Sequence, residues 1–168
     1  MSTDPTTGTT PDATADSGLK QRLRADLTTA MKARDKVRSG TIRMVITAIT
    51  EAEVSGTQSH DLTEQQVLDV VIKEAKKRRE AEEAYAAADR PELAAKERAE
   101  AEVLADYLPQ QLGADEIAAL VATAIESTGA RELGLKGMGK VMGVLTPQTK
   151  GKADGGAVAA EVRKQLAG

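Results

Sequence analysis

The chain has 168 residues, enough for one domain or two small ones, and a formal net charge of −3 that indicates no class of partner. It contains no cysteine, which excludes disulfides and thiolate zinc sites. Hydrophobic residues make up 40% of the chain, but there is no phenylalanine or tryptophan and there are only two tyrosines. A core of aliphatic side chains and methionine is typical of packed helices, so we predict an all-α protein in two parts.

The sequence shows no membrane span and no export signal at its N-terminus. No apolar run is long enough to cross a membrane, and no basic-then-apolar signal opens the sequence, so we expect a cytoplasmic protein without a membrane partner. Residues 1–17 are rich in threonine, proline, glycine and aspartate and offer little to bury. We therefore predict a disordered tail over residues 1–17.

Residues 18–108 are predicted to form an N-terminal helical domain, because their apolar residues recur at helical spacing. We predict two helices over residues 19–31 and 37–52. Gly40 falls inside the second helix and is unfavourable there by about 1 kcal/mol relative to alanine, which leaves the course of that helix open. The predicted buried positions of the two helices are Leu19, Leu23, Leu27, Ala30, Met31, Val37, Thr41, Met44, Val45, Ala48, Ile49 and Ala52.

Two further helices complete this domain. Thr63 and Gln66 match a capping box at the start of a long third helix, and Pro91 suits the first position of a fourth. Pro109 ends the fourth helix, and the segment "YLPQQLG" is typical of a hinge between two parts.

Residues 109–168 are predicted to form a small C-terminal domain of three helices. The first begins near Asp115 and stops at Gly129, and Asp154 caps the third. The apolar stripe of the middle helix consists of Met138, Val141, Met142 and Leu145.

The segment "GLKGMGKV", residues 134–141, resembles a nucleotide-binding phosphate loop but lacks one essential residue. Val141 stands where the loop needs a serine or threonine to hold magnesium, and the preceding residues are polar rather than a buried strand. The sequence therefore argues against nucleotide binding. We predict instead that Gly139 and Gly143 lie on a packed helix, where small residues let another helix approach closely.

No pattern in the sequence predicts a catalytic or metal centre. The single histidine, His60, lies in a polar segment without a second imidazole, so we expect no metal site and no cofactor. The run "KKRR" at residues 76–79 is flanked by glutamates and is predicted to be a solvated helix face. The carboxylates of residues 80–106 alternate with bases three and four positions away, which predicts ion pairs on a helix surface.

The charge distribution suggests one candidate nucleic-acid surface. The charges sum to −3 over residues 1–17, +6 over 18–50, −7 over 51–108 and +1 over 109–168. Within the last part, residues 131–152 carry five bases and one acid in a glycine-rich setting, which favours contact with a phosphate backbone. The near absence of aromatic residues excludes base stacking. The candidate nucleic-acid-binding residues are Arg131, Lys136, Lys140, Lys150, Lys152 and Arg79.

Three stretches together resemble the GatB/YqeY family. They are "LKQRLRADLTTAMKARDKVRSGTIRMVITAITEAE", "KRREAEEAYAAADRPELAAKERAEAEVLADYLPQQLGADEI" and "MGKVMGVLTPQTKGKADGGAVAAEVRKQL". The resemblance covers residues 19–167 and implies two α-helical parts. It also implies a link to glutamine-dependent tRNA amidotransferase, in which this module forms the mobile tail of the B subunit and touches the tRNA. The catalytic portion of that subunit has no counterpart here.

The family motif matches this chain at particular positions. The C-terminal motif matches Gly139, Lys140, Gly143, Gly151, Lys152, Asp154 and Gly155; the hinge matches Tyr107, Leu108 and Pro109; basic positions match Arg43, Arg79 and Arg90. We interpret Asp154 as a helix cap and Tyr107 as a packing residue.

Three functions follow as hypotheses. The first is a non-catalytic tRNA-binding or amidotransferase-associated module. The second is a protein-interaction module that uses the acidic middle helices. The third is a component of a carbon–nitrogen ligase with glutamine as amido donor, active only in a complex with amidotransferase subunits.

Overall fold

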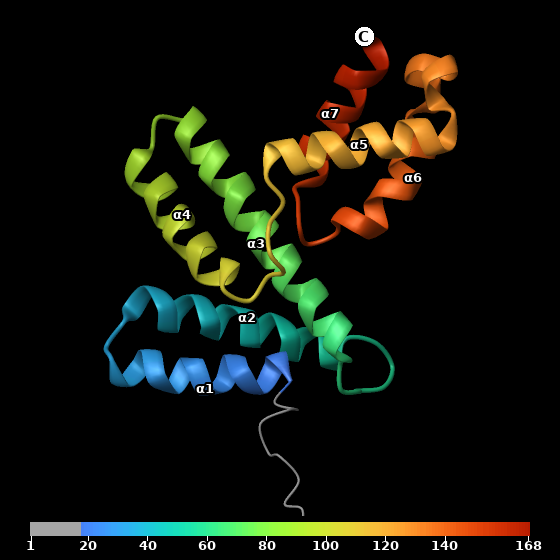
Figure 1. The fold of residues 1–168 in the computed structure, drawn as a ribbon. Helices are drawn as coiled ribbons and strands as arrows, with labels where there is room; N and C mark the ends of the chain where they lie inside the picture. Colours follow the sequence, from blue (N-terminus) through green and yellow to red (C-terminus); the bar gives the residue numbers. More distant parts are fainter. Residues whose placement is uncertain (1–17) are drawn as a thin grey trace, which may run out of the picture.

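The computed structural model describes residues 18–168, so the predicted tail over residues 1–17 lies outside the described residues. The described part of the chain is helical without any strand, as predicted. Its first half contains α1 (Leu19–Lys32), α2 (Lys36–Val54), α3 (Glu64–Ala87) and α4 (Pro91–Ala105). Figure 1 shows α1 and α2 as one hairpin and α3 and α4 as a second hairpin packed against it.

Local sequence signals set the bounds of these helices. The Thr63 hydroxyl accepts a hydrogen bond from the Gln66 backbone N–H, and the Gln66 side chain accepts one from the Thr63 backbone N–H, which confirms the predicted capping box. Pro91 occupies the first turn of α4, as predicted. The core of this half consists of Leu23, Ile42, Val45, Ile49, Val67, Val71, Ala75, Leu104 and Tyr107.

The second half contains α5 (Ala114–Thr128), the 3₁₀ helix η1 (Ala130–Gly137), α6 (Met138–Thr149) and α7 (Gly155–Ala167). Gly129 ends α5 in the left-handed conformation with φ 65°, as predicted. The segment η1 was not predicted, because its apolar residues are few and Gly134 interrupts it at φ 54°. The core of this half consists of Val121, Ala124, Ile125, Ala130, Val141, Leu145, Val158, Val162 and Leu166.

The two cores share no residue. We call residues 18–108 the N-terminal unit and residues 109–168 the C-terminal unit, and the predicted domain boundary between them stays a prediction. The C-terminal unit lies beside α3, on the side away from α4 (Figure 1). The position of α3 between α4 and the C-terminal unit makes it the element that both halves of the molecule contact.

The predicted packing of two helices, α1 and α2, was wrong at particular positions. Val37 and Met44 of α2 are 49% and 48% exposed, and Met31 of α1 is exposed as well. The core face of α2 is centred on Ile42, Val45 and Ile49, so the helical twist turns Val37 and Met44 away from it.

Gly139 and Gly143 do not support the close helix approach that the sequence suggested. Both are exposed, and a Cβ atom on either would meet nothing within 4 Å. Each lies two residues from a buried side chain of α6, Val141 or Leu145, which places it about 200° around the helix. The prediction that these glycines lie on a helix is correct, but the helix presents them to solvent.

Arg78 was predicted to belong to a solvated basic face, but it is only 7% exposed. Its Nε atom lies 2.8 Å from Oε2 of Glu100 and 3.8 Å from Oε2 of Glu97. Its Nη1 atom lies 3.5 Å from Oε2 of Glu74. The Nε–H bond is not directed at a hydrogen-bond acceptor, so the contact with Glu100 is an ion pair. Burial of Glu74 and Glu100 between α3 and α4 also overturns the prediction of purely solvated pairing here.

Candidate nucleic-acid interface

The structure separates the predicted basic surface into two groups. Arg131 and Lys136 belong to η1, and Lys140 lies in the first turn of α6. Lys150 and Lys152 follow the other end of α6. Lys150 lies ten positions after Lys140, which corresponds to about 15 Å along the helix axis. The five bases that are close in sequence therefore do not form one patch.

Arg131, Lys136 and Lys140 form the first group, which we call the distal cations. All three are exposed, and none has an ion-pair partner within residues 18–168. Leu133 and Leu135 are exposed beside them in η1. Cations without intramolecular partners can approach a phosphate without breaking an existing ion pair.

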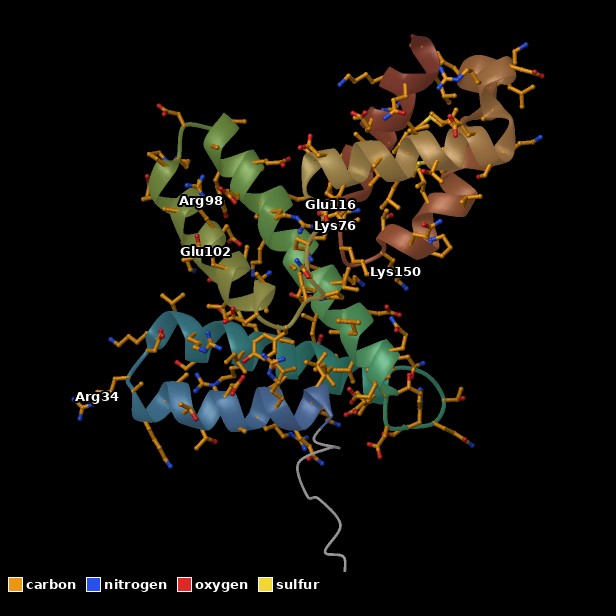
Figure 2. The ribbon with its side chains drawn as sticks, in the orientation of Figure 1. Arg34, Lys76, Arg98, Glu102, Glu116 and Lys150 are labelled. Carbon is orange, nitrogen blue, oxygen red and sulfur yellow. The ribbon has the colours of Figure 1, made fainter. Side chains whose placement is uncertain are left out.

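The second group lies where the two units meet. Lys150 Nζ is 3.0 Å from Oδ1 of Asp69, and Arg79 Nη2 is 4.0 Å from Oδ1 of Asp154. Figure 2 shows Lys76 of α3 and Lys150 at this junction. Hydrogen bonds from Lys150 and then Gln65 hold the pKa of Asp69 below its usual range. Arg79 and Lys150 therefore join α3 to the loop between α6 and α7.

Gly151 brings the backbone of the C-terminal unit close to Ile72 of α3. Its φ is +73°, and a Cβ atom there would lie 2.8 Å from Cδ1 of Ile72. The Gln111 side chain donates a hydrogen bond to the Gly151 carbonyl at 2.7 Å, and the Leu112 N–H donates to the Lys152 carbonyl at 2.8 Å. Only glycine combines this backbone conformation with this proximity to α3.

A pocket of about 200 Å³ opens beside Gly151. Apolar side chains of Ile72, Leu108 and Met142 line it together with Lys76, Arg79 and Lys150. Each of these cations already has a carboxylate partner, since Lys76 Nζ lies 3.7 Å from Oε1 of Glu80. The pocket is therefore close to neutral, and it fits a packing defect of the junction better than an anion site.

The predicted hinge residues lie next to this junction. Tyr107 is 4% exposed and belongs to the N-terminal core, and its hydroxyl donates a 2.5 Å hydrogen bond to Oδ2 of Asp26. Burial and this hydrogen bond raise the pKa of Tyr107 to about 12. The guanidinium of Arg22 lies 4.7 Å from the ring centre. Pro109 borders Gly151, with its Cδ 3.7 Å from the position of a Cβ there.

The remaining motif residues have local structural roles. The Asp154 carboxylate accepts a hydrogen bond from the Ala157 N–H at 3.1 Å and caps α7. Gly155 is the first residue of α7 and is exposed. Arg43 and Arg90 are exposed on the N-terminal unit, away from the distal cations. Among residues 18–168 no group of three or more side chains is arranged to bind a metal ion, and no helix is long and apolar enough to cross a membrane.

The sequence indicates Ile72 as a buried position of the third helix, but it did not identify Asp69 or the contact of Ile72 with the loop after α6. Both residues lie about eighty positions before the loop that they contact, and nothing in their own segment distinguishes them from the other residues on α3. Only their spacing of three, which places both on one face of α3, could have suggested a shared contact.

Comparison with known proteins shows which family this architecture belongs to. A family model described as Yqey-like protein matches residues 20–166 and therefore spans both units. The chain is also similar to a protein of Pyrenophora tritici-repentis named "Altered inheritance of mitochondria protein 41, mitochondrial". The two are 32% identical over 143 residues, which cover 84% of this chain and 76% of the relative.

Proposed function

Because the chain belongs to the YqeY-like protein family, we propose that it is a non-catalytic RNA-binding module whose partner is tRNA. One observation carries the proposal: the distal cations and Lys152 are exposed on the C-terminal unit without ion-pair partners in the described residues. The resemblance to the tail of an amidotransferase B subunit supports tRNA as the RNA. Amidotransferase subunits are the protein partners that the same resemblance suggests.

Recognition of the phosphate backbone is the mode of binding that these residues suit. Lysine and arginine side chains bind phosphates without reading the bases. The chain has two tyrosines, of which Tyr107 is buried, so base stacking contributes little. We therefore expect binding with low sequence preference and steep salt dependence, and the net charge of −3 keeps the affinity moderate.

The junction lets the C-terminal unit change its orientation on RNA. Two ion pairs, of Lys150 with Asp69 and of Arg79 with Asp154, connect the two units, and ion pairs that are partly exposed are weak. Rotation at Pro109 would release Lys150 for a phosphate while both cores stay intact. The cytoplasmic location stays a prediction, and the name of the fungal relative places that protein in mitochondria.

The test compares two triple variants of the full chain in a titration with total tRNA. The first carries Lys136→Glu, Lys140→Glu and Lys152→Glu. The matched control carries Arg24→Glu, Lys32→Glu and Lys73→Glu, which are exposed on the N-terminal unit. Each set changes the net charge by −6, from −3 to −9. Lys150 stays unchanged because it pairs with Asp69.

We expect the first variant to bind tRNA at least about tenfold more weakly than the wild type, since three phosphate contacts are lost. The control is expected to lose much less, because its cations lie elsewhere. Circular dichroism should show equal helix content in all three proteins. Equal weakening in both variants would mean that only the total charge matters, and it would remove the C-terminal unit as the interface.

A further inference from the structure

The side of α2 that faces away from the core is exposed from Arg43 to Val54 and half-buried at Gly40. Thr47 lies at the centre of this side, and its neighbours on the same side lie three, four and seven positions away. Met44 and Val54, both among them, are 48% and 60% exposed. We call this surface the outer face of α2. It consists of Gly40, Arg43, Met44, Thr47, Thr50, Glu51 and Val54.

A hollow of about 550 Å³ runs along the outer face, between α2 and α3. Glu74 and Lys77 of α3 form its far side. Gly40 lies in the lining, and a Cβ atom there would meet nothing within 4 Å, so the packing of this chain does not require glycine at the position. Glycine is unfavourable inside a helix, and here it leaves open space on the surface of α2.

The polar groups at the centre of the outer face are already satisfied. The Thr47 hydroxyl donates to the Arg43 carbonyl and the Thr50 hydroxyl to the Ile46 carbonyl, each at 3.0 Å. Both threonines are therefore able to pack against an apolar partner without leaving a hydroxyl unpaired. Together with Met44 they make the middle of this face largely apolar, and Val54 extends the apolar surface at one end.

The charges that flank this centre have no partner within their own chain. The Arg43 guanidinium donates a hydrogen bond to the sulfur of Met31 at 3.7 Å, and neither Arg43 nor Glu51 forms an ion pair among residues 18–168. Arg43 lies four residues before Thr47, and Glu51 lies four residues after it. Two side chains of opposite charge therefore lie at equal distances along the helix on either side of Thr47.

An antiparallel copy of α2 that crosses the first at Thr47 would place complementary residues opposite one another along the whole outer face. Arg43 of one chain would lie opposite Glu51 of the other, and the same pair would form a second time by symmetry. Gly40 and Val54 lie seven residues on either side of Thr47, so the exposed valine would enter the space that the glycine leaves. Met44 would pack against the methyl group of Thr50.

We propose that the outer face of α2 binds a second copy of this chain and forms a two-fold symmetric dimer. A second copy is favoured over an RNA, because Glu51, Met44 and Val54 would meet phosphates without any compensating contact. A contact centred on one helix pair lies at the small end of specific interfaces, so the dimer is expected to dissociate on dilution. The proposal stands independently of RNA binding, which uses the other unit.

Sedimentation velocity of the full chain across a range of micromolar concentrations tests the proposal. We expect the wild type to shift from monomer to dimer as its concentration rises. Arg43→Glu and Glu51→Arg each place like charges opposite one another twice, and each is expected to weaken the dimer at least about tenfold. The double variant Arg43→Glu, Glu51→Arg exchanges the charges and should restore it.

Arg163→Glu and Glu126→Arg are the matched controls, since they make the same charge changes at exposed positions of the C-terminal unit. Both should dimerise like the wild type, and thermal melts should show that every variant is folded. A wild type that stays monomeric at the highest concentration would overturn the proposal. Failure of the double variant to recover, or equal weakening by the controls, would overturn it as well.

Discussion

The Nζ atom of Lys150 lies 3.0 Å from Oδ1 of Asp69, and this ion pair links the residue that follows α6 to α3. The lowered pKa of Asp69, which arises first from the Lys150 hydrogen bond, means that the folded chain holds the carboxylate charged. The stability that this ion pair contributes is complete above pH 3.8, the ordinary pKa of the carboxyl group in the unfolded chain. It is lost as the pH falls through the lowered pKa of Asp69 in the folded chain.

We expect Asp69→Asn to broaden the range of distances between the two units while the helix content stays the same. Both side chains of the pair are partly exposed, so the change in the free energy of unfolding should stay under about 1 kcal/mol. Because the chain has no cysteine, the substitutions Glu92→Cys and Glu126→Cys provide two unique sites for dyes, one on each unit. Energy transfer between the dyes then measures the distance between the units. Acid should broaden the wild-type distances but leave those of the variant nearly unchanged. Identical distributions in both proteins at neutral pH would contradict this role of the pair.

Gly151→Ala is predicted to destabilise the chain by about 1–2 kcal/mol, because an L-residue is strained at φ +73° and its Cβ would press on Ile72. Urea denaturation measures the loss. Adding Ile72→Val removes the Cδ1 atom. The double variant should therefore recover only the part of the lost stability that comes from the contact with Ile72, and not the part that comes from backbone strain.

Gly143→Ala is the control for that substitution. Gly143 lies in α6 with nothing near its Cβ position, so alanine there should stabilise the chain by up to about 1 kcal/mol. Equal destabilisation at both glycines would show that the junction with α3 has no special requirement at Gly151.

Arg78→Met is predicted to destabilise the N-terminal unit by about 3–5 kcal/mol, because the carboxylates of Glu74 and Glu100 lose the buried cation that pairs with both. Lys77→Met is the matched control. Lys77 also pairs with Glu74, at 2.7 Å, but its side chain is more than half exposed, so its loss should change the free energy of unfolding by less than about 1 kcal/mol. Chemical denaturation of the two variants should separate them clearly; similar values would rule out a special role for the buried cluster.

Tyr107→Phe is predicted to destabilise the chain by about 1 kcal/mol through the loss of the hydrogen bond to Asp26. The pKa of Tyr107 is about 12 in the folded chain, above the ordinary tyrosine value of 10.0. The stability that this group contributes is therefore complete below pH 10 and is lost as the pH rises through about 12. Ultraviolet titration of the folded protein should show a phenol that ionises near 12 and is missing in the variant. A Tyr107 that titrates at 10 would mean that the hydroxyl is not buried against Asp26.

Local chemistry explains what the sequence predicts well. The capping box of Thr63, the proline at the start of α4 and the left-handed Gly129 act through neighbours within four residues, so their patterns can be read directly from the sequence. The all-α class follows from the same short-range signals together with the helical spacing of apolar residues.

The remaining features depend on contacts between distant segments. Arg78 is buried because α4 packs against it and places the carboxylates of Glu97 and Glu100 beside its guanidinium. Its own segment, in contrast, has the pattern of a solvated helix face. Val37 and Met44 fit an apolar stripe but lie outside the arc of α2 that faces the core. The division of the basic residues by α6 also depends on where the helix ends, since five bases within 22 residues read as one patch.

The salt dependence of tRNA binding tests the central proposal most directly. The logarithm of the binding constant is plotted against the logarithm of salt concentration for the wild type and for the variant with Lys136→Glu, Lys140→Glu and Lys152→Glu. If these lysines contact phosphates, the wild-type plot falls steeply and the slope of the variant is shallower by about 2–3. Parallel slopes, or no binding of the wild type at low salt, would contradict the proposed RNA-binding function.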